Sequence, residues 1–210
     1  MTLRSLVAAL ATTFAASAAS AAVLTAADST YGVFDNSSGT RTLSIAGAGT
    51  VTDVEITIDF AKCDDPAMTP GQTRCVSNGQ EFASETYFWL TSPAGTRVDL
   101  VNPHTYNNGL STGGRYVVTF DDQAPTLVGG ALATGTFRPV ALLAAFDGQL
   151  AAGNWILTVG DTTGADPLSY FSALLTVTTD GATVPLPGTL ALLGLGLAGA
   201  AGLGRRSRRD

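Results

Sequence analysis

The sequence has few of the residues on which common enzyme sites depend. Its 210 residues include one lysine, Lys62, one histidine, His104, and two cysteines. With a single histidine and no Gly-x-Ser-x-Gly motif, the sequence predicts no Ser-His-Asp nucleophile. Two cysteines are too few for a structural zinc cluster. The net charge of −6 also argues against nucleic acid as a partner, because such proteins need a basic surface. We therefore expect a protein that is not an enzyme.

The first 22 residues have the layout of a secretory signal peptide. Arg4 precedes an apolar run, Leu6–Ala16, and small residues follow at Ala19–Ala21. This order predicts export, with cleavage after Ala21 or Ala22. The alternative is a buried N-terminal helix, which the Ala-rich run does not favour because it lacks an amphipathic period.

The C-terminus has three parts. The tetrapeptide Val184–Pro187 precedes an uncharged stretch at residues 188–204, and a basic tail follows at residues 205–210. As a helix, the 17 uncharged residues would be about 26 Å long, which is enough to cross a thin hydrocarbon core. The arginines predict that the basic end stays in the cytoplasm. We therefore expect a C-terminal transmembrane helix.

This tail resembles the PEP-CTERM sorting signal of Gram-negative bacteria. The matching positions are Val184, Pro185, Pro187, Arg205, Arg206, Arg208 and Arg209. Leu186 stands where the signal usually has glutamate. The resemblance implies an exosortase as processing partner, export through the inner membrane, anchoring by the C-terminal helix, and a cell-envelope or extracellular location after processing. The alternative is a plain single-pass anchor.

The body between the two ends, residues 23–183, is acidic and contains both cysteines. Within it, 6 basic side chains face 16 acidic ones. Cys63 and Cys75 enclose a short segment rich in proline and glycine. Export places them in an oxidising compartment, so we predict a disulfide.

The body reads as β-strands. Mostly apolar residues, predicted to share the inner side of each strand, alternate at Thr52, Val54, Ile56, Ile58 and Phe60, at Tyr116, Val118 and Phe120, at Trp155, Leu157 and Val159, and at Phe171, Ala173, Leu175 and Val177. Turn-forming residues separate these runs. The sole helical candidate is Pro139–Ala145. The pattern predicts an all-β, antiparallel β-sandwich.

Two segments resemble the P domain of proprotein convertases, also called the P/Homo B domain. Glu85–Thr96 is similar to its Asp-Leu-x-x-x-Leu-x-Ser-Pro-x-Gly-Thr signature, and Phe146–Gly148 with Gly153–Asp161 is similar to its Phe-x-Gly and Gly-x-Trp-x-Leu-x-Val-x-Asp segments. The resemblance covers about Leu43–Thr179 and implies a jelly-roll-like sandwich, with Ser92–Thr96 as a tight turn and Trp155 in the core. This sequence departs from the family pattern at Glu85-Thr86, at Pro167 and in the extra loop before Glu85.

Two candidate sites follow, one acidic and one aromatic. The resemblance implies structural calcium at Glu85, Asp161 and Asp166, and composition adds Asp121 and Asp122. The alternative is that these carboxylates only solvate loops. Tyr87 and Trp89 alternate with Phe88 and Leu90, so an exposed aromatic pair could form a platform for sugar rings. The alternative is that a loop covers the pair.

We expect an exported, non-catalytic envelope or extracellular-matrix protein that is a binding or structural module, with exopolysaccharide as a candidate partner. The alternative is an accessory domain for a separate secreted subtilisin-like serine protease, since P domains elsewhere accompany such proteases. Family-level transfer would suggest serine endopeptidase activity, but the sequence contains no catalytic domain of that kind.

Overall fold

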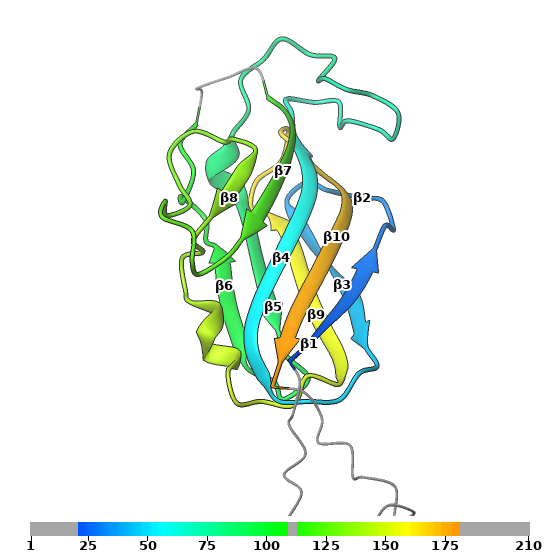
Figure 1. The fold of residues 1–210 in the computed structure, drawn as a ribbon. Coiled ribbons are helices and arrows are strands. Elements are labelled where there is room, and N and C mark those ends of the chain that lie inside the picture. The colour runs from blue at the N-terminus through cyan, green and yellow to red at the C-terminus, as the bar shows by residue number, and fades with distance from the viewer. Residues whose placement is uncertain (1–20, 109–112, 181–210) are drawn as a thin grey trace, which may run out of the picture. The chain divides into compact units, whose positions relative to one another are not determined.

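A computed structural model describes residues 21–108 and 113–180 of the chain (Figure 1). Within these residues the protein forms two β-sheets. The larger sheet contains β1 (Ala22–Asp28), β2 (Gly32–Phe34), β4 (Val51–Lys62), β7 (Gly114–Phe120), β8 (Gly135–Phe137) and β10 (Leu168–Thr179). The smaller sheet contains β3 (Ser37–Ile45), β5 (Thr86–Thr91), β6 (Arg97–Val101) and β9 (Gly153–Asp161). The predicted all-β, two-sheet sandwich is confirmed.

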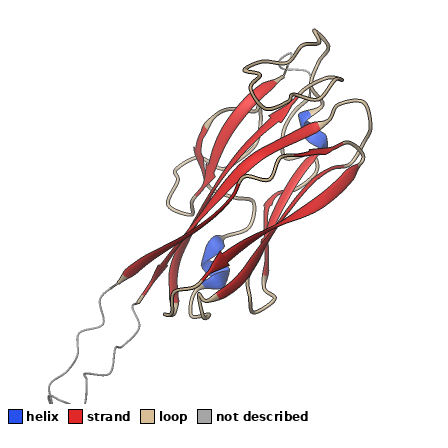
Figure 2. Ribbon diagram, turned by 90° about the vertical axis from the view of Figure 1, so that its right-hand side faces the viewer, coloured by secondary structure: helices blue, strands red, loops and turns tan. Residues whose placement is uncertain are grey.

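The two sheets form separate layers, as Figure 2 shows. The larger sheet has the order β1-β10-β4-β7-β8, with β2 beside β10, and the smaller has the order β3-β9-β5-β6. Every strand pair is antiparallel except β7 and β8, which run parallel. The expectation of a wholly antiparallel sandwich is therefore wrong at that edge, where a long connection brings the chain back to β8 in the same direction as β7.

The alternation of β4 predicts its buried face correctly except at one end. Val54, Ile56, Ile58 and Phe60 are buried, but Thr52 is exposed. The pairing with β10 shifts register beside Val51, so this residue, rather than Thr52, faces the core. Such a bulge inserts one residue into a strand and reverses the alternation beyond it.

A second irregularity in β10 corrects another prediction. The register with β4 shifts between Tyr170 and Ser172, so Phe171 does not share the core-facing row of Ala173. Tyr170 instead lies in the main core, fully buried. Phe171 belongs to a smaller apolar cluster with Met68. The predicted inward position of Phe171 is therefore wrong, because the bulge turns its side chain to the opposite face.

The predicted turn after β5 and the predicted core tryptophan are both confirmed. Gly95 N–H donates to Ser92 O (2.9 Å), and Gly95 has a φ of +86°, which favours glycine. Trp155 is fully buried, and its indole N–H donates to Ala151 O (2.9 Å). Its ring meets that of Phe146 edge to face, with centroids 4.9 Å apart.

The structure has two short 3-10 helices, η1 (Ala83–Glu85) and η2 (Leu143–Phe146), within the described residues. The second overlaps the predicted helical candidate at Pro139–Ala145 and starts later. Strands β1, β2 and β3 had no sequence prediction. β1 and β3 are rich in alanine, serine and threonine, so their apolar alternation is weak, and β2 has three residues, which is too short to show a period.

Almost the whole predicted signal peptide lies outside the described residues, and so do the predicted transmembrane helix and sorting signal. β1 begins at Ala22, beside the predicted cleavage site. Within residues 21–108 and 113–180 we find no helix that is long and apolar enough to span a membrane.

Candidate functional site

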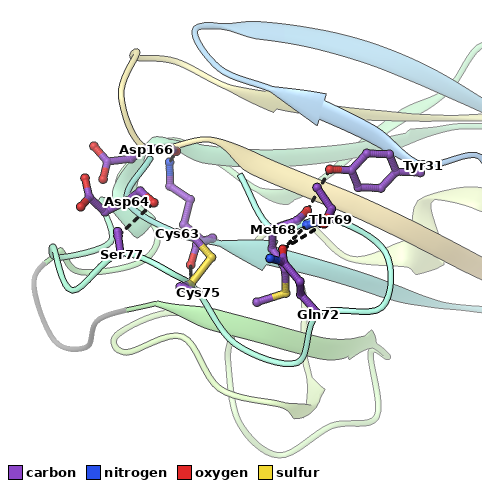
Figure 3. Close-up of a disulfide and its surroundings, with 10 residues drawn as sticks. Tyr31, Cys63, Asp64, Met68, Thr69, Gln72, Cys75, Ser77 and Asp166 are labelled. Carbon is purple, nitrogen blue, oxygen red and sulfur yellow. Dashed lines mark hydrogen bonds between the residues drawn. A yellow bond between two sulfur atoms is a disulfide. The ribbon is translucent and has the colours of Figure 1, made fainter. Parts of the chain in front are cut away.

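The predicted disulfide is present and fixes a loop onto the larger sheet. Cys63 directly follows β4 and is bonded to Cys75, with their Cα atoms 5.6 Å apart (Figure 3). Met68, inside the loop, is fully buried against Phe171. The Tyr31 hydroxyl donates to Met68 O (2.8 Å). The loop thus covers the side of β10 that faces away from the main core.

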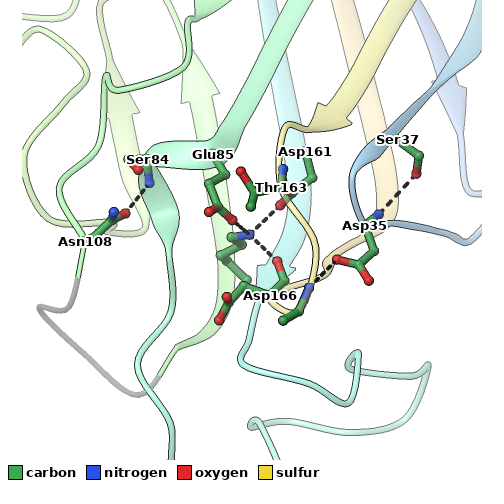
Figure 4. Close-up of polar contacts among 10 residues, drawn as sticks. Asp35, Ser37, Ser84, Glu85, Asn108, Asp161, Thr163 and Asp166 are labelled. Carbon is green, nitrogen blue, oxygen red and sulfur yellow. Dashed lines mark hydrogen bonds and ion pairs between the residues drawn. The ribbon is translucent and has the colours of Figure 1, made fainter.

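Next to this disulfide, the side chain of Lys62 ends among three acidic residues. Lys62 is the last residue of β4, and its side chain is fully buried. The Nζ donates to Glu85 Oε2 (3.3 Å) and, at closer range, to Asp161 Oδ2 and the backbone oxygen of Asp166. Figure 4 shows Glu85, Asp161 and Asp166 around this point. We call these four residues the Lys62 cluster.

The second oxygen of Asp161 is also fixed. Its Oδ1 accepts the backbone N–H of Thr163 (3.0 Å) in the loop that follows β9. The Asp161 side chain has no exposed surface, whereas that of Glu85 is 12% exposed. Asp161 is therefore held through both carboxyl oxygens, by Lys62 and by Thr163, and Glu85 lies at the solvent edge of the Lys62 cluster.

Burial shifts two acids of the cluster, Asp161 and Asp166, toward their protonated forms. Desolvation raises the pKa of Asp161 even though the Lys62 ammonium and the Thr163 N–H act in the opposite direction. Desolvation likewise raises the pKa of Asp166 to about 6. Among the described residues, the buried Asp166 Oδ1 has no hydrogen-bond partner. The raised pKa values of Asp161 and Asp166 both follow from the low polarity of the interior, which disfavours a carboxylate.

The expected calcium site does not fit this geometry. The structure brings Glu85, Asp161 and Asp166 together, but their oxygens surround an ammonium group in the place where a cation would lie. Calcium requires six to eight oxygen ligands, and it would have to displace the buried Lys62 to reach these. Within the described part of the chain, we find no group of three or more His, Cys, Asp or Glu side chains placed to hold a metal ion.

Asp121 and Asp122 lie elsewhere in the sandwich. They follow the end of β7 at Phe120, whereas Lys62 pairs with Gly114 at the opposite end of that strand. Asp122 accepts the N–H groups of Leu143 (2.9 Å) and Ala144 (2.8 Å), and so satisfies the start of η2. Asp121 Oδ1 accepts Gln123 N–H (2.7 Å). Both carboxylates therefore organise local loops.

The second candidate site is a row of planar side chains on the outer face of the smaller sheet. Phe88 and Leu90 point into the core, so Tyr87 and Trp89 face outward and are half-buried. Their rings stack with centroids 4.8 Å apart and planes 15° apart. Arg97 on β6 places its guanidinium carbon 3.7 Å from the Trp89 ring centroid. We call Tyr87, Trp89 and Arg97 the aromatic row.

The order of the aromatic row limits what it can bind. Arg97 pairs with Thr91, two residues beyond Trp89, while Tyr87 lies two residues before Trp89 on the same strand. The two faces of the Trp89 ring are therefore both occupied, and the loop closed by the disulfide packs against Phe171 instead of this row. A sugar would contact the exposed edges of the row or displace Arg97.

The fold thus defines an acidic, two-sheet all-β protein with an internal ion-pair cluster and an outward aromatic row. Residues 183–209 match the family described as the PEP-CTERM protein-sorting motif. This motif implies export, processing by an exosortase and sorting to the cell surface.

A comparison with curated proteins finds no match. Solved structures similar to this chain include two of infectious bursal disease virus. The Gx strain structure is 17% identical, has a TM-score of 0.36, and the match covers 79% of this chain and 33% of that one. The Gt strain structure is 14% identical, has a TM-score of 0.33, and the match covers 89% of this chain and 50% of that one. The chain thus spans half or less of those proteins.

Lys62 is the residue that the sequence analysis missed. Its position gave a usable signal, because it continues the inward row of Ile58 and Phe60 at the same spacing of two. A lysine in such a row is unusual, since lysine is almost never fully buried unless it is paired. The signal predicts an acidic partner across the sandwich.

Proposed function

We propose that this protein is a non-catalytic component of the bacterial cell envelope or extracellular matrix, sorted there by an exosortase. The sorting motif at residues 183–209 is the observation that carries the proposal. The Lys62 cluster supports a structural role, because the carboxylates of Glu85 and Asp161 and the backbone oxygen of Asp166 all contact one buried cation.

The body is proposed to be a P/Homo B-like domain. Supporting features are the tight turn at Ser92–Thr96 and the buried Trp155 of the Gly-x-Trp segment. Gln149 connects the two motifs, since its side chain accepts from Ser92 Oγ (2.6 Å) and donates to Thr96 Oγ1 (2.9 Å). These contacts hold the Ser92–Thr96 turn against the segment that follows Phe146–Gly148.

Exopolysaccharide is the proposed partner, and the aromatic row is the proposed contact. Half-exposed Tyr87 and Trp89 offer apolar ring edges beside the polar group of Arg97, a combination that suits sugars. The acidic surface of the body argues against a strongly anionic polymer. A neutral or weakly charged polysaccharide is the better match.

The test is co-sedimentation of the exported protein with exopolysaccharide from its host, with calcium and with chelator. We expect saturable retention in both conditions and at least a several-fold loss for Trp89→Ala. Phe82→Ala is the matched control, because Phe82 is an exposed aromatic residue outside the aromatic row. Its retention should equal that of the wild type.

Absence of retention in both conditions would contradict the polysaccharide role. A protein partner, foremost a secreted subtilisin-like protease, would then be sought by crosslinking at the cell surface. Equal losses of retention in Trp89→Ala and Phe82→Ala would contradict the aromatic row as the contact site.

A further inference from the structure

The only lysine of the chain connects the two layers of the sandwich. Lys62 pairs with Leu168 of β10 and Gly114 of β7 in the larger sheet. Asp161 pairs with Thr86 of β5 in the smaller sheet. The contact between the Lys62 amine and the Asp161 carboxyl therefore spans the interior, and neither side chain has exposed surface.

Three features of this contact go beyond an ordinary ion pair. The amine and the carboxyl are held in direct contact. A second carboxyl group, Glu85, lies 3.3 Å from the same amine. The Asp161 oxygen that does not touch the amine accepts a backbone N–H from Thr163. Together these are a nucleophile, an acid–base group and a donor placed to stabilise negative charge on a carbonyl oxygen.

We propose that Lys62 and Asp161 condense to form an intramolecular amide bond, which covalently joins the two sheets. The inference is independent of the proposed polysaccharide binding.

The bond would form by loss of one water molecule. The Lys62 ammonium transfers a proton to the Asp161 carboxylate, and the free Nζ attacks Asp161 Cγ. The negative charge that develops on Oδ1 is stabilised by the Thr163 N–H. Glu85 takes the second proton from Nζ and delivers it to Oδ2, which leaves as water. Nζ keeps one hydrogen in the amide, Glu85 returns to its original state, and no oxidant or reductant is needed.

The surroundings favour this condensation in two ways. Contact between the reacting groups replaces a bimolecular encounter, and well-oriented intramolecular reactions reach effective concentrations of about 10⁵ M or more. Burial removes the water that would reverse the reaction, and it raises the pKa of Asp161, which favours the neutral acid. The amide also replaces two buried charges, whose desolvation opposes a buried ion pair.

The first test is the intact mass of the exported protein after reduction and unfolding. We expect a mass lower by one water than that of the same residues with free side chains. A protease digest should contain a branched peptide that joins the Lys62 segment to the Asp161 segment. The full mass, together with linear peptides carrying unmodified Lys62 and Asp161, would overturn the proposal and leave a buried ion pair.

The single lysine allows a second test that needs no variant. An amine-specific reagent applied to the reduced, unfolded chain has only the N-terminus and Lys62 as targets. We expect one label, at the N-terminus, because an amide nitrogen does not react. A second label on Lys62 would contradict the bond.

Variants separate the roles of the residues. Lys62→Met and Asp161→Ala should each abolish the loss of water. Glu85→Gln should fold and retain a measurable unbonded fraction, since it lacks the group that moves the proton. Asp59→Ala is the matched control, because its exposed ion pair with Arg115 (2.7 Å) lies on the same strand as Lys62. It should show the same loss of water as the wild type, and complete bond formation in Glu85→Gln would overturn the role of Glu85.

Discussion

Gly160 of β9 and Tyr87 of β5 are paired residues, and the Tyr87 ring lies directly over the glycine. A β-carbon at position 160 would lie 2.2 Å from Tyr87 Cζ. The stack of Tyr87 on Trp89 therefore depends on the absence of a side chain on the neighbouring strand.

Gly160→Ala should disturb the aromatic row and leave the sandwich folded. The clash is with the end of a flexible side chain, which can move at the expense of its stack on Trp89. We expect an altered near-ultraviolet circular dichroism spectrum and a loss of about 1 kcal/mol in the free energy of unfolding. Gly164→Ala is the control, since its nearest neighbour, Asp35, is at an ordinary 3.8 Å. Identical spectra for the wild type and Gly160→Ala would contradict the described stack.

Removing the disulfide should destabilise the protein without altering its core. Replacing Cys63 and Cys75 by serine frees a short loop in the unfolded chain, which is expected to lower the free energy of unfolding by about 3 kcal/mol. Urea unfolding measures the loss, and added reductant should have no effect on the double variant. Alkylation of the unreduced, unfolded wild type should label no cysteine; two labels would contradict the bond.

The raised pKa of Asp166 predicts a decrease in stability as pH rises. Its pKa goes from 3.8 to about 6 on folding, mainly through desolvation, with Glu85, Asp64 and Asp161 acting in the same direction and Lys62 against them. The folded state therefore holds this proton more tightly, so the free energy of unfolding falls as pH rises through this interval. In Asp166→Asn, the free energy of unfolding should fall less between pH 4.5 and pH 7.5 than in the wild type, as measured by urea unfolding. Parallel pH profiles for the two proteins would contradict the shift.

Calcium should not stabilise the protein. The Lys62 ammonium lies where the ion would have to bind, and a ligand raises the melting temperature only if it binds the folded state. We expect equal melting temperatures in millimolar calcium and in chelator. A melting temperature that rises with calcium concentration would contradict this expectation and support the calcium site predicted from the sequence.

The basic end of the sorting motif should be needed for sorting. Replacing Arg205, Arg206, Arg208 and Arg209 by alanine removes the charges expected to stay in the cytoplasm. We expect loss of membrane retention or of processing, measured by cell fractionation and by the size of the protein. A matched control replaces Arg74 and Arg138 in the body. Unchanged location and size in the tail variant would contradict the role of the arginines.

The sequence predicts the main strands because their periodicity of two is strong. The apolar row of β4 and the buried Trp155 of β9 follow from alternation alone. Phe171 could not be placed this way, because a single inserted residue in a bulge reverses the alternation, and the sequence carries no mark of that insertion. The parallel return of β8 beside β7 likewise depends on tertiary packing.

The sequence predicts the three acidic residues of the Lys62 cluster but does not predict the lysine at its centre. Resemblance to a family placed Glu85, Asp161 and Asp166 together, and the structure brings them together. The cation among them is Lys62, which lies 99 residues before Asp161 in the sequence. Spacing along the chain carries no information about such a contact across two sheets. The position of Lys62 in the inward-facing row of β4 does indicate that it needs a buried acidic partner.

The pairing of β10 has a mechanical consequence for a protein with a sorting motif at residues 183–209. Ala22 of β1 pairs with Thr179 at the end of β10, and β4 pairs with β10 from Lys62 to Val51. A pull directed along β10 would load its hydrogen bonds to the antiparallel neighbours β1 and β4 together in shear. The strand nearest the sorting motif is thus the one best placed to resist tension at the cell surface.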